Sequence, residues 1–273
     1  MQLVQGEEAS SQPDPTHIVD YYRAQAVEHG SSPSSTMLDE IVRDKEIEAI
    51  LLFLDRVSGR NLLEIGCGNG FLLEEIANRF GTRFAQHGLD LTRDMLTVAR
   101  HRPIDCNWYL ADVQKLPFAS NTFDVIVSER VVINILDPEG QMRAFDEIAR
   151  VLKPQGVVVA IEGFKTGLQN LNRARAEFLL PAIPEPDVNN WFTEQRWQSF
   201  LSNRFREFDS KEAAGLAPEN FLSSHYFMTR FVHDAIKPEG GKLRNTEFAK
   251  FFSAALPPAG DYSPLRIKYL RKK

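Results

Sequence analysis

The chain has only two cysteines in 273 residues, and this scarcity already limits what it can be. Cys67 and Cys106 have no metal-ligand spacing, and two thiols cannot form a disulfide framework, so we expect a reducing compartment. The six histidines are equally scattered and show no metal spacing. We therefore expect no metal site.

The chain also lacks an excess of basic residues and any long apolar run. Its 32 Lys and Arg residues are outnumbered by 37 Asp and Glu residues, and this acidic balance argues against a general nucleic-acid-binding protein. Apolar runs such as 49–54 are far too short to cross a bilayer, and residues 1–15 contain no signal-peptide core. We expect a cytoplasmic protein with no nucleic-acid or membrane partner; whether it forms a homodimer is left open.

What the chain does contain is a regular alternation of strand and helix patterns between residues 60 and 163. Nearly all-apolar strands that alternate with amphipathic helices indicate an α/β fold with a parallel sheet covered on both faces. A short helix is expected at 16–30. The expected core strands are 62–65, 83–89, 107–111, 123–128 and 157–162, and the expected core helices are 39–57, 70–80, 92–101 and 139–152.

The alternation stops after residue 163, which suggests a division of the chain into four parts. We expect a flexible N-terminal segment with a short helix at 1–36, the core at 37–163, a helical lid at 164–204, and C-terminal strands with a closing segment of the same domain at 205–273. Within the last part, 205–214 and 223–235 are rich in aromatic residues and are predicted as strands. A helix at about 245–255 and a final extended piece follow.

A glycine-rich loop follows the first core strand. Gly66, Gly68 and Gly70 recur at every second position, just after the acidic Glu64. Ligands of open α/β sheets bind at the carboxyl ends of the strands, where glycine lets the backbone approach them closely. A pyrophosphate cofactor prefers the G-x-G-x-x-G spacing, whereas a carboxylate beside the loop suits the ammonium of an amino acid. The loop therefore favours a sulfonium cofactor over a dinucleotide.

Two further acidic residues follow the next two strands. Asp90 can accept hydrogen bonds from both hydroxyls of a ribose, and Asp112 can accept one from the amino group of an adenine. Since parallel strands end at one edge of the sheet, both carboxylates should lie near the glycine loop.

Five motifs, at 62–70, 88–90, 111–118, 123–128 and 147–156, resemble in sequence and order those of the class I S-adenosylmethionine-dependent methyltransferases. The resemblance implies a Rossmann-like seven-stranded sheet, mostly parallel, with a C-terminal antiparallel hairpin. It implies S-adenosyl-L-methionine as cofactor and S-adenosyl-L-homocysteine as product. By this resemblance Glu64, Gly66, Gly68 and Gly70 hold the methionine part, Asp90 holds the ribose, and Asp112 with Val113 holds the adenine. Cys67, Asn69, Leu91, Met95, Ser128 and Glu129 complete the expected cofactor site.

Further motifs at 43–47, 128–134, 162–163 and 167–175 resemble small-molecule methyltransferases encoded with glycan and secondary-metabolite pathways. Many of those enzymes have histidine where this chain has Asn134, so one potential base is absent. The resemblance implies that a sugar, a nucleotide-sugar or a natural-product intermediate is methylated on oxygen or nitrogen. The residues expected to contact this acceptor are Tyr22, Arg130, Asn134, Asn172, Arg175 and Tyr226.

Methyl transfer from a sulfonium is an in-line displacement that needs alignment and, for a hydroxyl acceptor, a base. Glu129, Glu162 and His225 are the candidate bases, in no firm order. Three alternatives stay open: a noncatalytic cofactor-binding scaffold, a methyltransferase of protein or RNA, and a nicotinamide oxidoreductase. The acidic balance argues against a macromolecular acceptor, and the loop spacing argues against the oxidoreductase.

Overall fold

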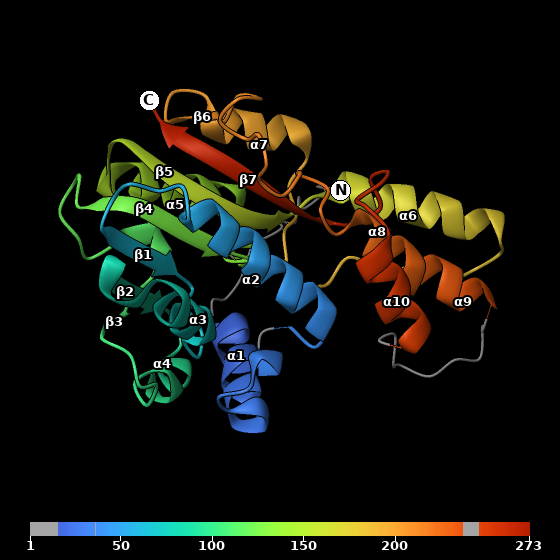
Figure 1. The fold of residues 1–273 in the computed structure, drawn as a ribbon, viewed down its shortest axis with the longest axis horizontal. Coiled ribbons are helices and arrows are strands. Elements are labelled where there is room, and N and C mark those ends of the chain that lie inside the picture. The colour runs from blue at the N-terminus through green and yellow to red at the C-terminus, as the bar shows by residue number, and fades with distance from the viewer. Residues whose placement is uncertain (1–15, 36, 237–245) are drawn as a thin grey trace, which may run out of the picture.

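A single seven-stranded sheet forms the centre of the protein. The structure, a computed structural model, describes residues 16–35, 37–236 and 246–273, and the predicted flexibility of 1–15 lies outside these residues. The strand order is β3-β2-β1-β4-β5-β7-β6 (Figure 1). Strands β1 to β5 run parallel, and β7 is antiparallel to both β5 and β6. The predicted Rossmann-like, mostly parallel sheet is confirmed.

The core elements occur where the sequence pattern predicts them, with shifts of a few residues at their ends. The strands are β1 (Asn61–Ile65), β2 (Ala85–Asp90), β3 (Cys106–Leu110), β4 (Phe123–Glu129), β5 (Leu152–Gly163), β6 (Phe205–Glu207) and β7 (Leu265–Lys272). The α-helices are α1 (Thr16–His29), α2 (Glu40–Leu54), α3 (Phe71–Phe80), α4 (Arg93–Ala99), α5 (Pro138–Val151), α6 (Lys165–Glu177), α7 (Glu194–Leu201), α8 (Ser223–Phe227), α9 (His233–Ile236) and α10 (Glu247–Ala255). The single-turn 3-10 helices are η1 (Pro33–Ser35), η2 (Gly81–Arg83), η3 (Val113–Lys115) and η4 (Val132–Asn134), and the π-helical segment η5 (Met228–Val232) joins α8 to α9.

Each face of the sheet is covered by its own hydrophobic cluster. Leu62 belongs to the cluster that includes α2 and α3, whereas its neighbour Leu63 belongs to the cluster that includes α5 and α7. Successive side chains of a strand point to opposite faces, so a strand buried on both sides reads as an unbroken apolar run. Because β1 to β5 run parallel, their carboxyl ends lie at one edge of the sheet, and the loops that follow them begin there.

Two predictions for the C-terminal part are wrong. The segment 223–235 is helical, because its aromatic side chains recur at helical spacing: Phe227 and Phe231 pack with ring centroids 4.7 Å apart. Of the strand predicted at 205–214, only Phe205–Glu207 forms. The high strand propensity of aromatic residues was outweighed by this local packing.

The final extended piece, β7, is the strand that completes the sheet. Its apolar Leu265, Ile267 and Tyr269 alternate with Arg266 and Lys268, which is the period-2 pattern of a strand. Both cations are buried and paired with several carboxylates from α7, β6 and the surrounding loops. The antiparallel β6–β7 pair is therefore present, but residues 208–264 separate its strands, so it is not a tight hairpin.

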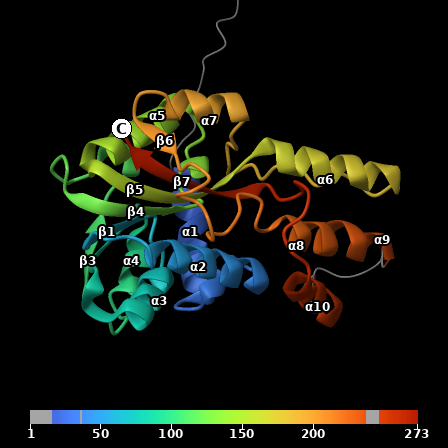
Figure 2. The ribbon, with the colours of Figure 1, turned by 45° about the horizontal axis from the view of Figure 1, so that its top comes forward.

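A group of helices lies beyond the end of the sheet at which β5 leads into α6. Figure 2 shows α6, α8, α9 and α10 together there, away from the sheet faces. Asp39 joins this group to α2: its Oδ1 accepts from the backbone N–H of Val42 (3.2 Å) and caps the helix. Its Oδ2 accepts from Arg230 Nη2 (2.8 Å) and lies 3.0 Å from His225 Nε2. Although burial opposes it, His225 and Arg230 lower the pKa of Asp39.

Replacing Asp39 tests this junction. Asp39→Ala removes the cap of α2 and the acceptor of two buried donors, so we expect the free energy of unfolding in urea to fall by about 2–4 kcal/mol. Asp39→Asn keeps a capping oxygen but loses the negative charge, and we expect about half of that loss. Wild-type stability in Asp39→Ala would contradict the junction.

Candidate functional site

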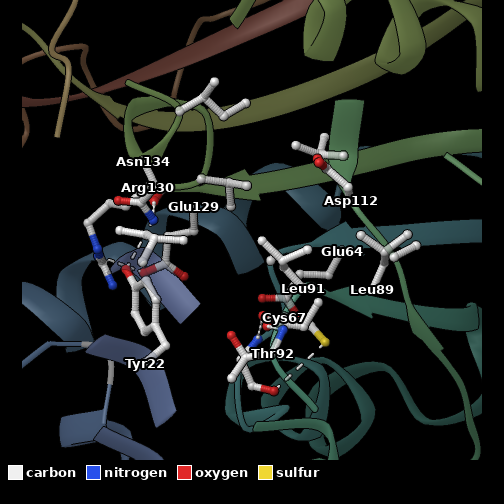
Figure 3. Close-up of a pocket in the computed structure, with 18 of the residues that line it drawn as sticks. Tyr22, Glu64, Cys67, Leu89, Leu91, Thr92, Asp112, Glu129, Arg130 and Asn134 are labelled. Atoms are coloured by element: carbon white, nitrogen blue, oxygen red, sulfur yellow. Dashed lines mark hydrogen bonds and ion pairs between the residues drawn. The ribbon is translucent and has the colours of Figure 1, made fainter. Parts of the chain in front are cut away.

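A cavity lies at the carboxyl ends of the parallel strands, between the loops that follow them and α1 (Figure 3). It brings together side chains that are far apart in the sequence. Of the predicted cofactor residues, the cavity is lined by Glu64, Gly66, Cys67, Gly68, Asn69, Asp90, Leu91, Asp112, Val113 and Glu129. Of the predicted acceptor residues, it is lined by Tyr22, Arg130 and Asn134.

The glycine loop shapes the floor of the cavity. Gly66 has a φ of 64°, which side-chain-bearing residues rarely adopt, and a Cβ there would lie 2.3 Å from Val131 Cγ2. Gly70 has a φ of 75° and starts α3, and its own Cβ would lie 2.7 Å from Trp108. Gly70 does not line the cavity. Both glycines are needed for the tight turn that leaves room for a ligand.

Asp90 is held rigidly at the end of β2. Its Oδ2 accepts from the backbone N–H of Gly68 (2.8 Å), and its Oδ1 accepts from that of Thr92 (2.7 Å). Burial raises the pKa of Asp90, and these two donors oppose the shift. Each carboxylate oxygen can accept a second hydrogen bond, so the fixed group can also bind a pair of neighbouring hydroxyls.

Asp112 occupies the corresponding position after β3. Its Oδ1 accepts from the backbone N–H of Gln114 (2.8 Å), so Asp112 caps the 3-10 helix η3. Leu91, Val113 and Leu136 also line the cavity and provide apolar walls. A slot with apolar walls and one carboxylate at its edge suits a flat ring that carries an amino group.

Glu64 is the most unusual member of the site. The side chain is 3% exposed, and its Oε2 has no hydrogen-bond partner among the described residues. Burial, with Glu129 adding to it, raises the pKa of Glu64 well above its usual value. A buried polar atom without a partner is unfavourable, and an ammonium donor in the cavity would satisfy it. The carboxyl groups of Glu64, Asp90 and Asp112 therefore fit the ammonium, the ribose hydroxyls and the amino group of the base in an adenosyl amino acid.

Glu129, at the end of β4, forms ion pairs with two arginines. Its Oε1 accepts from Arg43 Nη1 and from Arg130 Nη1, the latter at 2.8 Å. Although burial opposes it, Arg43 and Arg130 lower the pKa of Glu129 to about 2. A carboxylate with so low a pKa is a weak base, so Glu129 is poorly suited to abstract a proton.

The mouth of the cavity is framed by a chain of hydrogen bonds between three segments. Asn134 Nδ2 donates to the hydroxyl of Tyr22 on α1 (3.1 Å), and its Oδ1 accepts from Asn189 Nδ2 (2.7 Å). Figure 3 shows Tyr22 directed toward Asn134 and Arg130 on the side of the cavity away from Leu91 and Thr92. Asn69 Nδ2 donates to the carbonyls of residues 30 and 32, which fastens the segment after α1 to the glycine loop.

Glu162 does not line the cavity but shapes the loop that does. It is fully buried and accepts from the N–H groups of Val132 and Ile133 (both 3.1 Å) and from Ser128 Oγ (3.0 Å). Burial raises the pKa of Glu162 to about 7, and these donors oppose the shift. Ser128, predicted as a cofactor ligand, is thus a partner of Glu162.

The other predicted residues lie elsewhere in the fold. His225 Nδ1 lies 2.5 Å from Ser253 Oγ, so both ring nitrogens are occupied inside the helical group. Arg175 donates to Asp234 (2.8 Å) and Asn172 to the carbonyl of Ile183 (2.9 Å). None of the following lines the cavity: His225, Tyr226, Asn172, Arg175 and Met95.

Several lining residues are not among those predicted: Ile18, Arg43, Leu89, Thr92, Ala111, Gln114, Val131, Ile135, Leu136 and Asp137. The sequence could have predicted a role for Arg43, since Arg43 and Glu46 occupy positions on the buried face of α2 that are otherwise apolar. Charged side chains on an apolar face are rarely buried without a partner. Ile18 and Leu136 gave no comparable signal.

Comparison with known proteins agrees with this geometry. Residues 62–156 match a family described as "Methyltransferase domain". The chain is 31% identical over 109 residues to the biotin biosynthesis bifunctional protein BioHC of Teredinibacter turnerae, covering 36% of this chain and 18% of that protein. It is 30% identical over 178 residues to the ubiquinone/menaquinone biosynthesis C-methyltransferase UbiE of Ruegeria sp., covering 60% and 66%. The chain thus spans less than two thirds of the length of either relative.

A solved structure supports the fold alone. A SAM-dependent methyltransferase of Leishmania major superposes with a TM-score of 0.57 at 17% identity, covering 74% of this chain and 80% of that one. Among the described residues, no helix has the length and apolar character needed to cross a membrane. The same residues contain no group of His, Cys, Asp and Glu that could hold a metal ion.

Replacing Glu162 tests its structural position. Both side-chain oxygens of Glu162 accept hydrogen bonds, and each keeps a lone pair even in the protonated acid, whereas the amide nitrogen of a glutamine accepts none. Glu162→Gln should therefore lower the free energy of unfolding by about 1–3 kcal/mol at about pH 5. Since its pKa is raised from 4.5 to about 7, the folded protein binds the extra proton and wild-type stability falls as pH rises through this range.

The difference between the two proteins in urea titrations should therefore be smaller at about pH 8 than at about pH 5. Glu139→Gln, an exposed change on α5, should leave stability unchanged at both. A wild-type advantage that grows with pH would contradict this position of Glu162.

Proposed function

Since the chain belongs to the class I S-adenosylmethionine-dependent methyltransferases, we propose that it transfers a methyl group from this cofactor to a small molecule bound beneath α1. One observation carries the proposal. The buried carboxyl of Glu64, whose Oε2 has no hydrogen-bond partner among the described residues, shares one cavity with Asp90 and Asp112, which come from the ends of the adjacent strands β2 and β3.

We assign the cofactor-binding roles from this placement. Glu64 and the backbone of Gly66 and Gly68 hold the amino-acid end, Asp90 binds the two ribose hydroxyls, and Asp112 with Val113 binds the adenine. When bound, the cofactor supplies a methyl group already activated on a sulfonium. The protein then contributes alignment and the exclusion of water, which are the main requirements of an in-line displacement.

The acceptor is proposed to lie against Tyr22, Arg130 and Asn134. The hydrogen bond from Asn189 brings the segment between α6 and α7 to this mouth, which supports the proposed role of residues 164–204 as a lid. A mouth closed from two sides suits a small acceptor such as a sugar, a nucleotide-sugar or a natural-product intermediate. One relative, UbiE, is named for methylation in quinone biosynthesis, which also concerns a small molecule.

Between oxygen and nitrogen, we favour nitrogen as the acceptor atom. A hydroxyl must lose its proton during transfer, whereas an amine need only arrive neutral. Of the three candidate bases, Glu162 and His225 do not line the cavity, and Glu129 is held ionised by two arginines. The side chains described at the mouth thus favour an acceptor that needs no base.

Calorimetric titration with S-adenosylhomocysteine tests the cofactor site. The wild-type protein should bind this product and should not bind NAD. Asp90→Asn and Glu64→Gln each remove one charged hydrogen-bond acceptor and should weaken binding about 10- to 100-fold. Asp105→Asn, an exposed change before β3, is the matched control and should bind normally. Absence of product binding by the wild type would contradict the proposed function.

The acceptor class is tested by transfer of a labelled methyl group to a panel of small amines and hydroxyl compounds, with bulk RNA and protein assayed in parallel. We expect transfer to an amine, with no label in macromolecules. If the product binds but no acceptor is methylated, the noncatalytic scaffold is favoured; label in RNA or protein would contradict a small acceptor.

A further inference from the structure

A buried cluster of four charged side chains forms part of the cavity wall: Arg43, Glu129 and Arg130 line the cavity, and Glu46 is paired with Arg130. Arg43 and Glu46 come from α2, one turn apart, whereas Glu129 ends β4 and Arg130 follows it. Glu129 accepts from both arginines, and Arg130 also donates to Glu46. Glu46 is 0% exposed and does not line the cavity. Arg130 itself has a φ of 55°, so its backbone is fixed in a left-handed conformation beside the cavity.

The charges around the cavity do not balance. Glu64 and Asp90 join Glu46 and Glu129 as buried carboxyl groups, whereas only Arg43 and Arg130 oppose them. A third arginine near Glu64, at position 102, is already paired with the carboxylate of residue 74. Two carboxyl groups are therefore in excess, and an uncompensated buried charge is unfavourable.

The two carboxyl groups without a compensating charge are those of Glu46 and Glu64. No N–H or O–H group of the described residues donates to Glu46 Oε1 or Glu64 Oε2, whereas both oxygens of Asp90 accept backbone N–H groups. Glu46 also shares a hydrogen bond with Glu129, which raises the pKa of Glu46 and lowers that of Glu129. Burial, opposed by Arg130 and reinforced by Glu129, raises the pKa of Glu46 to about 8. The shift favours the protonated form of Glu46 near neutral pH, and burial favours the protonated form of Glu64 in the same way.

Among the described residues, the remaining groups that face Glu46 and Glu64 supply no compensating charge. Besides Arg130 and Glu129, Glu46 is faced by Tyr226 of α8, whose pKa burial raises. Glu64 is faced by the thiols of Cys67 and Cys106, whose pKa values are also raised by burial. Tyr226 and the two cysteines are therefore neutral near neutral pH. The charged groups that face Glu46 and Glu64 are the four carboxyl groups and three arginines already named.

The methyl donor and its product differ by one charge. Both carry an ammonium and a carboxylate, but only the donor carries the sulfonium. We assign the ammonium, which both ligands carry, to Glu64. The protonation of Glu64 therefore changes in the same way when either ligand binds. We propose that Glu46 releases its proton to solvent when the donor binds and keeps it when the product binds. Glu46 thereby determines the preference of the cavity for donor over product.

This inference rests on the proposed function and predicts a definite dependence on pH. Below the pKa of Glu46, donor binding releases one proton more than product binding, so the preference for the donor should rise up to about tenfold per pH unit. Above that pKa, Glu46 is already ionised and the preference should become constant. Tight retention of the donor and easier release of the product would follow near neutral pH.

Calorimetric titrations of S-adenosylmethionine and S-adenosylhomocysteine, from about pH 6 to about pH 9, test the inference. Each is repeated in two buffers of different ionisation enthalpy, which gives the number of protons released. We expect about one more proton for the donor than for the product near neutral pH. Equal proton release for the two ligands would overturn the inference, whereas failure to bind either ligand would overturn the proposed function instead.

Three variants locate the proton. Glu46→Gln should abolish the pH dependence of the donor-to-product ratio, whereas Glu64→Gln should weaken both ligands alike and retain it. Glu48→Gln, an exposed change on the same helix, should behave like the wild type. Thermal melting confirms that each variant is folded. If Glu46→Gln keeps the extra proton of the wild type, the inference is wrong; the wild-type measurement decides the question even if that variant does not fold.

Discussion

The burial of more carboxyl groups than arginines at one edge of the sheet is the constraint on which the site depends. Such an excess is unfavourable without a bound cation, and Glu64 Oε2 has no hydrogen-bond partner in the part of the chain that the structure describes. It becomes favourable when a cation occupies the cavity. The glycine turns, which keep side chains out of the floor at Gly66, and the fixed carboxylate of Asp90 prepare the same space. The cavity is thus preorganised for a positively charged adenosyl ligand.

Helix α2 connects this site to the rest of the fold. Asp39, Arg43 and Glu46 are spaced by four and three residues, so they follow one face of the helix. Asp39 binds the helical group beyond the sheet, through His225 and Arg230, while Arg43 and Glu46 reach the end of β4. One helix therefore positions both the outer helices and the charged wall of the cavity.

The sequence predicts the core and the cofactor side of the site because both depend on local patterns. Apolar strands in alternation with helices identify β1 to β5, and Glu64, Asp90 and Asp112 follow directly from the strand ends. The helical 223–235 and the long connection before β7 depend on packing between distant segments. For the same reason, His225 and Glu162 look like candidate bases in the sequence and yet serve as buried partners of Asp39 and of the loop after β4.

A crystal structure of the protein with S-adenosylhomocysteine bound tests the central claim most directly. The account predicts that the amino nitrogen of the product lies within about 3 Å of Glu64 Oε2 and that both ribose hydroxyls donate to Asp90. A product bound outside this cavity, or one that leaves Glu64 Oε2 without a partner, would contradict it.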